Sequence, residues 1–150
     1  MINITSYGQA QESDLEAFEQ KLGFPLPTDY RTFLENHNGG RVNSQTFFVE
    51  DLGESVLLRA FFGIKNPVET LNLDFWLNEY KDEIQETALI IGKEPGGGLI
   101  LYITAGDEKG VYFWDHGHFF SESSEDDGNT YFLANTFTEF CDSLKDFTLA

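Results

Sequence analysis

The residues best suited to chemistry are the four at Asp115-His116-Gly117-His118. Two histidines placed two apart on an extended chain point to the same face, so both imidazoles could reach one metal ion. Asp115, or a distant residue such as His37, would supply a third ligand. The chain contains no HExxH motif and no cysteine pair that would support such a site. We therefore expect no metal and no other cofactor. The cluster is interpreted as a strand end, with one histidine hydrogen-bonded to the backbone and the other in solvent.

A second candidate is the glycine-rich segment from Gly92 to Gly98, which contains Lys93. This segment lacks the GxxxxGK[ST] order of a phosphate loop. It also leads into a predicted strand, whereas a phosphate loop must open a helix. We interpret its glycines as turn positions that need a positive φ or a close backbone approach.

Nucleophilic catalysis has no support in the residue pattern. The chain lacks the GxSxG elbow, and its one cysteine, Cys141, lies on an apolar stripe where a thiol acts as a small hydrophobe. Carboxylates are so abundant that some pair will lie about 5–9 Å apart by chance, so a glycosidase interpretation has no specificity. We predict that the protein is not an enzyme.

Charge is the outlying property of the 150 residues: nine basic against twenty-six acidic side chains give a net charge of −17. This charge opposes binding to nucleic acid and to anionic membranes, since both depend on Lys and Arg. It attracts basic partners and speeds their association, although it would serve solubility equally well. A single cysteine excludes an internal disulfide, and no apolar run approaches the roughly 20 residues of a membrane span. The first residues do not resemble a signal peptide, so we expect a cytoplasmic protein.

Helical signals occur near both ends of the sequence. A capping box at Ser13 predicts a helix that ends at Gly23, and a second helix follows until Asn38. Asn66, followed by a proline, predicts the cap of a third helix that reaches Ile84. A capping box at Thr136 predicts the last helix. The apolar faces of the first, second and last helices are expected to contain Leu15, Phe18 and Leu22; Tyr30, Phe33 and Leu34; and Phe137, Phe140, Cys141, Leu144 and Phe147.

Strand signals fill the middle of the chain. Branched and aromatic residues predict strands at 46–49, 56–62, 88–91, 99–103 and 111–114. Their connections are short, which favours antiparallel hairpins over parallel crossovers. We therefore predict an α+β fold in a single domain, residues 1–150, with a mostly antiparallel sheet flanked by N-terminal and C-terminal helices.

Several of these motifs together resemble the signature of the SUKH superfamily. Residues 22–34 read LGFPLPTDYRTFL, and residues 36–40 read NHNGG, which is similar to the second helix and stop of that family. Residues 62–63, 90–92 and 97–100 match its middle glycine positions, and GVYFWDH at 110–116 is similar to its late strand. The resemblance extends over nearly the whole chain, and the order of the motifs makes it specific.

The resemblance implies a bacterial immunity protein, an antitoxin that neutralises a cognate secreted toxin, often a nuclease, by occluding its active site. Other members are longer regulators of cell-wall assembly and stress signalling, so a non-enzymatic regulatory scaffold is the alternative. A third possibility is a small-molecule or enzymatic module that uses a cleft around Asp115, His116 and His118. The resemblance implies no enzymatic activity and no cofactor, and it leaves the oligomeric state and the toxin open.

We expect the toxin domain to be basic, so acidic loops are the predicted contact surface. The first set lies between 117 and 129 and is taken together with Asp115, and the second set lies in the turn between the first two predicted strands. In order, these residues are Asp115, Glu122, Glu125, Asp126 and Asp127, then Glu50, Asp51 and Glu54.

Overall fold

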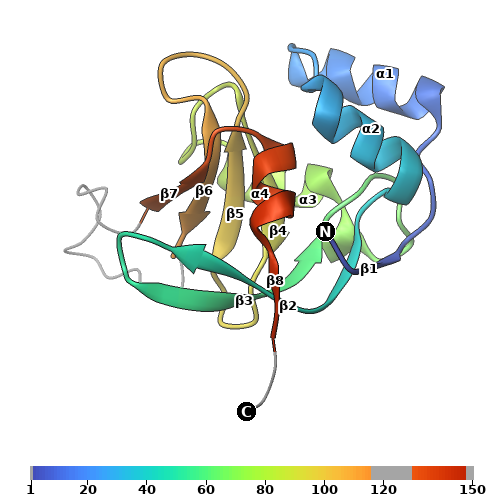
Figure 1. The fold of residues 1–150 in the computed structure, drawn as a ribbon. Helices are drawn as coiled ribbons and strands as arrows, with labels where there is room; N and C mark the ends of the chain where they lie inside the picture. Colours follow the sequence, from blue (N-terminus) through green and yellow to red (C-terminus); the bar gives the residue numbers. More distant parts are fainter. Residues whose placement is uncertain (1, 116–129, 148–150) are drawn as a thin grey trace.

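The computed structural model describes residues 2–115 and 130–147 (Figure 1). Its strands form an antiparallel sheet in sequence order from β1 to β7, and β8 pairs with β2. The strands are β1 (Ile4–Ser6), β2 (Gly40–Val49), β3 (Glu54–Phe61), β4 (Ala88–Lys93), β5 (Leu99–Ile103), β6 (Gly110–Trp114), β7 (Thr130–Ala134) and β8 (Lys145–Asp146). The helices are α1 (Glu12–Leu22), α2 (Thr28–His37), the 3-10 turn η1 (Glu69–Leu71), α3 (Leu73–Tyr80) and α4 (Phe137–Ser143).

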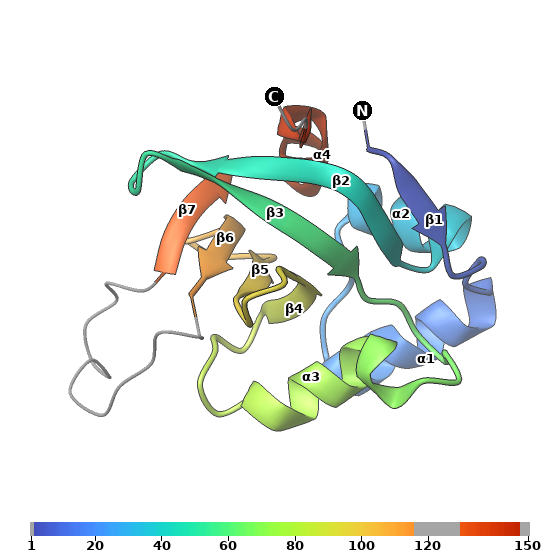
Figure 2. The same ribbon diagram turned by 90° about the horizontal axis from the view of Figure 1, so that it is seen from below.

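The sheet curls because β3 and β4 pair over a short length. Only Ala60 and Phe61 of β3 are in register with β4, so the rest of the β2–β3 hairpin diverges from that strand. The hairpin then arches over β5 and β6 (Figure 2). The rings of Phe47 in β2 and Phe113 in β6 lie 5.3 Å apart between centroids. The curl thus encloses an apolar interior between the two halves of the sheet.

Helices α2 and α4 close the concave side of this sheet. Phe140 of α4 packs against Phe47 at 5.7 Å and Phe61 at 6.2 Å between ring centroids. Phe137 packs against Tyr30 of α2 at 5.1 Å and Phe61 at 5.4 Å. Edge-on and tilted aromatic pairs of this kind add stability beyond the area they bury. Many of the aromatic side chains of the sequence therefore pack together in one core.

Helix α3 covers the convex side of the sheet. Its Trp76 stacks between Phe62 at 5.0 Å and Tyr80 at 6.2 Å, and Tyr80 meets Trp114 of β6 edge-on at 5.4 Å. With helices on both faces, β4 and β5 are buried along nearly their whole length. Such strands read as continuous apolar runs, which explains their sequence.

The α+β class and the antiparallel hairpins predicted from the sequence are confirmed. The stop at Gly23 is also confirmed: it has a φ of 86° and donates its backbone N–H to Glu19 O at 3.0 Å. The predicted cap at Ser13 is wrong. Helix α1 begins at Glu12, where the carbonyl of Gln11 accepts the N–H of Leu15, without a side-chain cap.

The predicted start of the third helix is also wrong. Asn66 does not cap a helix, because it closes a loop with Asn72 instead. The Asn66 N–H donates to Asn72 Oδ1 at 2.7 Å, and Asn72 Nδ2 donates to Asn66 O at 3.0 Å. Gly63 accepts from Leu73 N–H at 2.8 Å, which fixes the chain where α3 begins. Tertiary hydrogen bonds thus replace the expected first turn, and Ile84 lies beyond the helix.

At the C-terminal end, the cap at Thr136 is confirmed, since its Oγ1 accepts the N–H of Glu139 at 3.0 Å. The helix ends at Ser143, so the predicted stripe does not continue to Phe147. Leu144 is extended (φ −64°, ψ 139°), and the chain then pairs with β2 as β8. Strands β1, β7 and β8 were not predicted.

Candidate functional site

The acidic turn of residues 50–54 joins β2 to β3 and lies at the tip of the hairpin. Glu50, Asp51 and Glu54 are all exposed there. Gly53 makes the turn possible, with a φ of 64° and a backbone N–H that donates to Val49 O at 2.8 Å. Within 2–115 and 130–147, none of the three carboxylates forms a hydrogen bond or an ion pair with another side chain. Their negative charge therefore faces solvent, outside the ion pairs of the described residues.

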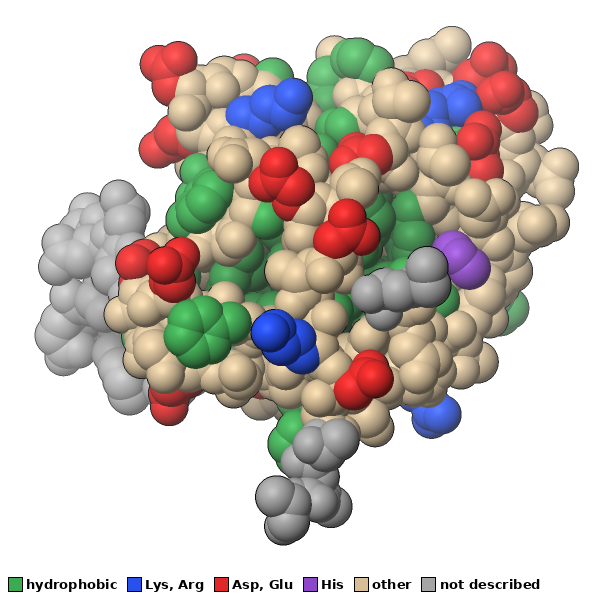
Figure 3. All heavy atoms as spheres, viewed as in Figure 1, with side chains coloured by type: hydrophobic (Ala, Val, Ile, Leu, Met, Phe, Trp, Pro, Cys, Tyr) green, Lys and Arg blue, Asp and Glu red, His purple; other side chains and the backbone are tan. Residues whose placement is uncertain are grey.

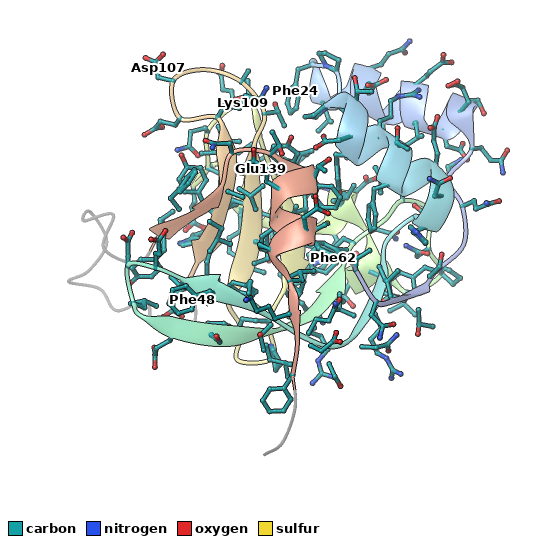
Figure 4. All side chains as sticks on the ribbon, in the orientation of Figure 1. Phe24, Phe48, Phe62, Asp107, Lys109 and Glu139 are labelled. Atoms are coloured by element: carbon teal, nitrogen blue, oxygen red, sulfur yellow. The ribbon has the colours of Figure 1, made fainter. Side chains whose placement is uncertain are left out.

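Exposed apolar side chains, which were not predicted from the residue pattern, lie beside this turn. Phe48 is 55% exposed, Leu52 38% and Leu57 37%. The signal was present as the Phe47-Phe48 doublet, because consecutive strand residues point to opposite faces. Phe47 is 1% exposed and fills the core, so Phe48 must face outward (Figure 4). In the space-filling view a hydrophobic side chain lies open on the hairpin beside a group of carboxylates (Figure 3).

Asp115 directly follows β6 and is partly exposed. The end of β6 and the β2–β3 turn lie toward the same side of the molecule (Figures 1 and 2). The structure thus brings Asp115 and the acidic turn to one side. The remaining predicted residues lie outside the described part of the chain: Glu122, Glu125, Asp126 and Asp127, and the two histidines His116 and His118.

The ion pairs of the described residues gather at the helical end instead. Arg31 of α2 contacts three carboxylates, including Glu35 at 3.0 Å, and Lys65 contacts Asp14 at 3.0 Å. Lys21 contacts Asp74 at 3.3 Å. These three cations are therefore held around α1, α2 and α3, away from the hairpin turn.

The backbone amides of the glycine-rich segment before β5 are bound by the side chain of Glu94 from the same segment. The carboxylate of Glu94 accepts the N–H of Gly98 at 2.6 Å through Oε1 and that of Gly96 at 2.9 Å through Oε2. A phosphate would need such backbone amides, which are already satisfied. A Cβ at Gly98 would lie 2.5 Å from the ring of Phe113, and Gly97 has a φ of 102°. The interpretation of this segment as a turn with a close backbone approach is confirmed.

The other side chains that could bind a metal or act as a nucleophile do not form a site within the described residues. Within 2–115 and 130–147 there is no group of three or more His, Cys, Asp or Glu that could hold a metal ion. His37 ends α2 and packs its ring against Phe33 at 5.5 Å. Burial, with smaller contributions from Asp142 and Asp29, raises the pKa of the Cys141 thiol to about 12. A thiol that stays protonated at neutral pH is a poor nucleophile.

A shallow hollow of about 440 Å³ lies between the end of α1 and the segment that follows α3. Leu22 and Phe24 line one side, and Leu77 and Ile84 line the other. The charged residues of its lining, Lys81, Asp82 and Glu86, are exposed. No helix in the described residues is long and apolar enough to cross a membrane.

Comparison with known proteins adds the family. The model of the SMI1 / KNR4 family (SUKH-1) matches residues 9–143, which is most of the chain. The chain is also 28% identical, over 149 aligned residues, to the SPbeta prophage-derived uncharacterized protein YokK of Bacillus subtilis (strain 168). That alignment covers 88% of this chain and 73% of the relative. The chain therefore belongs to the SMI1/KNR4 family (SUKH-1), which supports a general role of the immunity-protein or SMI1/KNR4 kind.

Proposed function

We propose that this protein is an immunity protein that binds a cognate toxin, a basic nuclease, in the cytoplasm and occludes its active site without catalysing a reaction. The observation that carries the proposal is the SUKH-1 match over residues 9–143. Because members of this family act by binding toxins, the match favours a binding function over the enzymatic and small-molecule alternatives.

The charge of the chain supports a nuclease as the target. A nuclease active site is lined with cations that receive the phosphate backbone, and a protein of net charge −17 offers the same sign of charge as that backbone. Electrostatic attraction would raise the association rate above the ~10⁵–10⁶ M⁻¹s⁻¹ of a neutral pair. Exposed carboxylates that form no ion pair with a described side chain, such as those of the β2–β3 turn, are the groups that can act in this way.

Co-expression tests the proposal. The C-terminal domain of a candidate secreted toxin, sought first among the genes next to that of this protein, is expressed in a sensitive bacterium with and without the chain. We expect growth to be restored only when the chain is present, and the purified chain to inhibit the nuclease activity of the toxin domain at equimolar ratio. A matched control uses a toxin domain whose catalytic residue is replaced.

The opposite outcome is equally clear. If the toxin domain kills in the presence of the chain and does not bind it in vitro, the immunity role is wrong. Retention of a cell-wall or stress-pathway protein by the chain, in place of the toxin, would then favour the regulatory scaffold.

A further inference from the structure

We infer that the outer face of the β2–β3 hairpin is the docking surface for the toxin, which fits it with an apolar socket surrounded by lysines and arginines. This hairpin face comprises Thr46, Phe48, Ser55, Leu57 and the neighbouring Lys145 of β8. The inference rests on the proposed function and adds the surface and the chemistry of its partner.

The register of the strands places these side chains together. Phe48 is opposite Ser55, and Thr46 is opposite Leu57, so all four share one face of the antiparallel pair. Phe48 and Leu57 are therefore diagonal neighbours, a spacing of about 7–8 Å between backbones that large side chains can bridge. On the other edge of β2, Lys145 is opposite Thr46 and extends the same face.

The apolar residues on this face are open to solvent, in contrast with those on the inner face. Phe48 is 55% exposed and Leu57 37%, whereas Phe47 and Leu58, their sequence neighbours, are each 1% exposed. Phe147 is 47% exposed, and its N–H donates to Ser44 O of β2 at 2.7 Å, so it lies beside the same strand. Single exposed apolar residues are ordinary, but several on one side of a hairpin indicate an interaction surface.

Charge decides which partner fits. The acidic turn directly continues the hairpin face, and its exposed Glu50, Asp51 and Glu54 form no ion pair with a described side chain; Lys145 is the basic residue of the face itself. Phe48 is an exposed aromatic residue beside carboxylates that form no ion pair. This matches the usual plan of an interface, in which an apolar anchor is surrounded by a polar rim. The partner must therefore present cations around an apolar socket. A second copy of this acidic chain would instead bring like charges together.

The experiment measures binding of the purified toxin C-terminal domain that the chain neutralises in the co-expression test. Phe48→Ser and, separately, Leu57→Ser remove the apolar contacts from exposed positions. We expect Phe48→Ser to weaken the Kd by about 30-fold or more, and Leu57→Ser to weaken it less. Val68→Ser is the matched control, because Val68 is also 55% exposed but precedes η1 outside the hairpin face. An unchanged Kd for both hairpin variants, or an equal loss for Val68→Ser, overturns the inference.

A second arm separates local charge from net charge. The triple variant Glu50→Lys, Asp51→Lys, Glu54→Lys is compared with Asp82→Lys, Glu83→Lys, Glu86→Lys, whose exposed carboxylates follow α3. Both variants change the net charge equally. We expect the first to slow association by about tenfold or more and the second to slow it much less. Equal slowing would assign the effect to the whole molecule and overturn the role of this turn.

The two levels of the proposal fail in different ways. If the wild-type chain does not bind the toxin domain, the proposed function and the docking surface are both wrong. If the wild-type chain binds and protects while the hairpin variants behave like it, the immunity role stands and only the docking surface is wrong.

Discussion

Thr138 donates both its backbone N–H and its hydroxyl to Oδ2 of Asp29, each at 2.9 Å, across 109 residues of sequence. Asp29 lies in the first turn of α2, and Thr138 lies in the first turn of α4. The other oxygen, Oδ1, accepts the hydroxyl of Tyr102 in β5 at 3.4 Å. One carboxylate therefore joins two helices and the sheet beneath them, and it explains why an aspartate precedes Tyr30 in the second-helix motif.

Asp29→Ala is expected to lower the free energy of unfolding by about 2 kcal/mol, since it removes charge-assisted hydrogen bonds to α4. Thr138→Ala keeps the backbone donor and should lose less. Urea denaturation of both single variants and the double variant gives the coupling energy between the two side chains. If the two losses add without coupling, the contact does not hold α4 in place.

Asn38 ends α2 in a left-handed conformation and ties it to a distant loop. Its φ is 47°, its Oδ1 accepts the N–H of Ile64 at 2.8 Å and its Nδ2 donates to Ile64 O at 2.9 Å. Asn38→Ala should cost about 2–3 kcal/mol, because buried backbone groups lose their partners and the conformation is strained. Asn38→Gly relieves the strain alone and should be the milder variant. Thermal unfolding that ranks the two in the opposite order contradicts this account.

The hydroxyl of Tyr30 is buried and has no hydrogen-bond partner among the described residues. Burial, and to a smaller extent Tyr102, raises the pKa of Tyr30 far above its ordinary value, so the group stays neutral. Tyr30→Phe removes an unsatisfied polar atom while keeping the ring contacts with Phe33 and Phe137. We expect stability to remain equal or to rise by up to about 1 kcal/mol in denaturant titrations. A decrease in stability of more than about 1 kcal/mol would reveal a hydrogen-bond partner for the hydroxyl.

Alkaline pH should destabilise the protein in part through Cys141. Burial raises the pKa of its thiol to about 12 from 9.0, so the folded state keeps a proton that the unfolded state releases. The stabilising effect is complete below pH 9 and is lost as pH rises toward 12. Urea unfolding near about pH 7.5 and about pH 10.5 should show a smaller decrease for Cys141→Ala than for the wild-type chain. Equal decreases would mean that the thiol titrates normally.

Local signals in the sequence correctly predicted two helix ends that are set by their own residues, although the equally local capping box at Ser13 was wrong. Gly23 and the Thr136 capping box act within one turn of helix, so their positions were readable. Elements whose ends depend on contacts with residues distant in the sequence could not be predicted. The start of α3 depends on the pairing of Asn66 with Asn72 and Gly63, and β8 has only two residues and exists because β2 offers an edge.

The candidate site shows the same division. The abundance of carboxylates and the turn at residues 50–54 were evident from composition and spacing. The position of Phe48 was not, because strand alternation alone does not say which member of the Phe47-Phe48 doublet faces the core. That choice follows from the register between β2 and β3 and from the packing of Phe47 against Phe113 and Phe140.

The outer edge of β2 is paired by segments from the two ends of the chain. β1 covers its beginning through pairs such as Ile4 with Val42, and β8 covers its middle through Gln45 with Asp146. The second of these contacts spans 101 residues. During synthesis β1 is available as soon as β2 forms, but the middle of this edge stays unpaired until β8 has left the ribosome. Because an open edge templates pairing with other chains, aggregation of the nascent protein competes with folding most strongly just before residues 145 and 146 emerge.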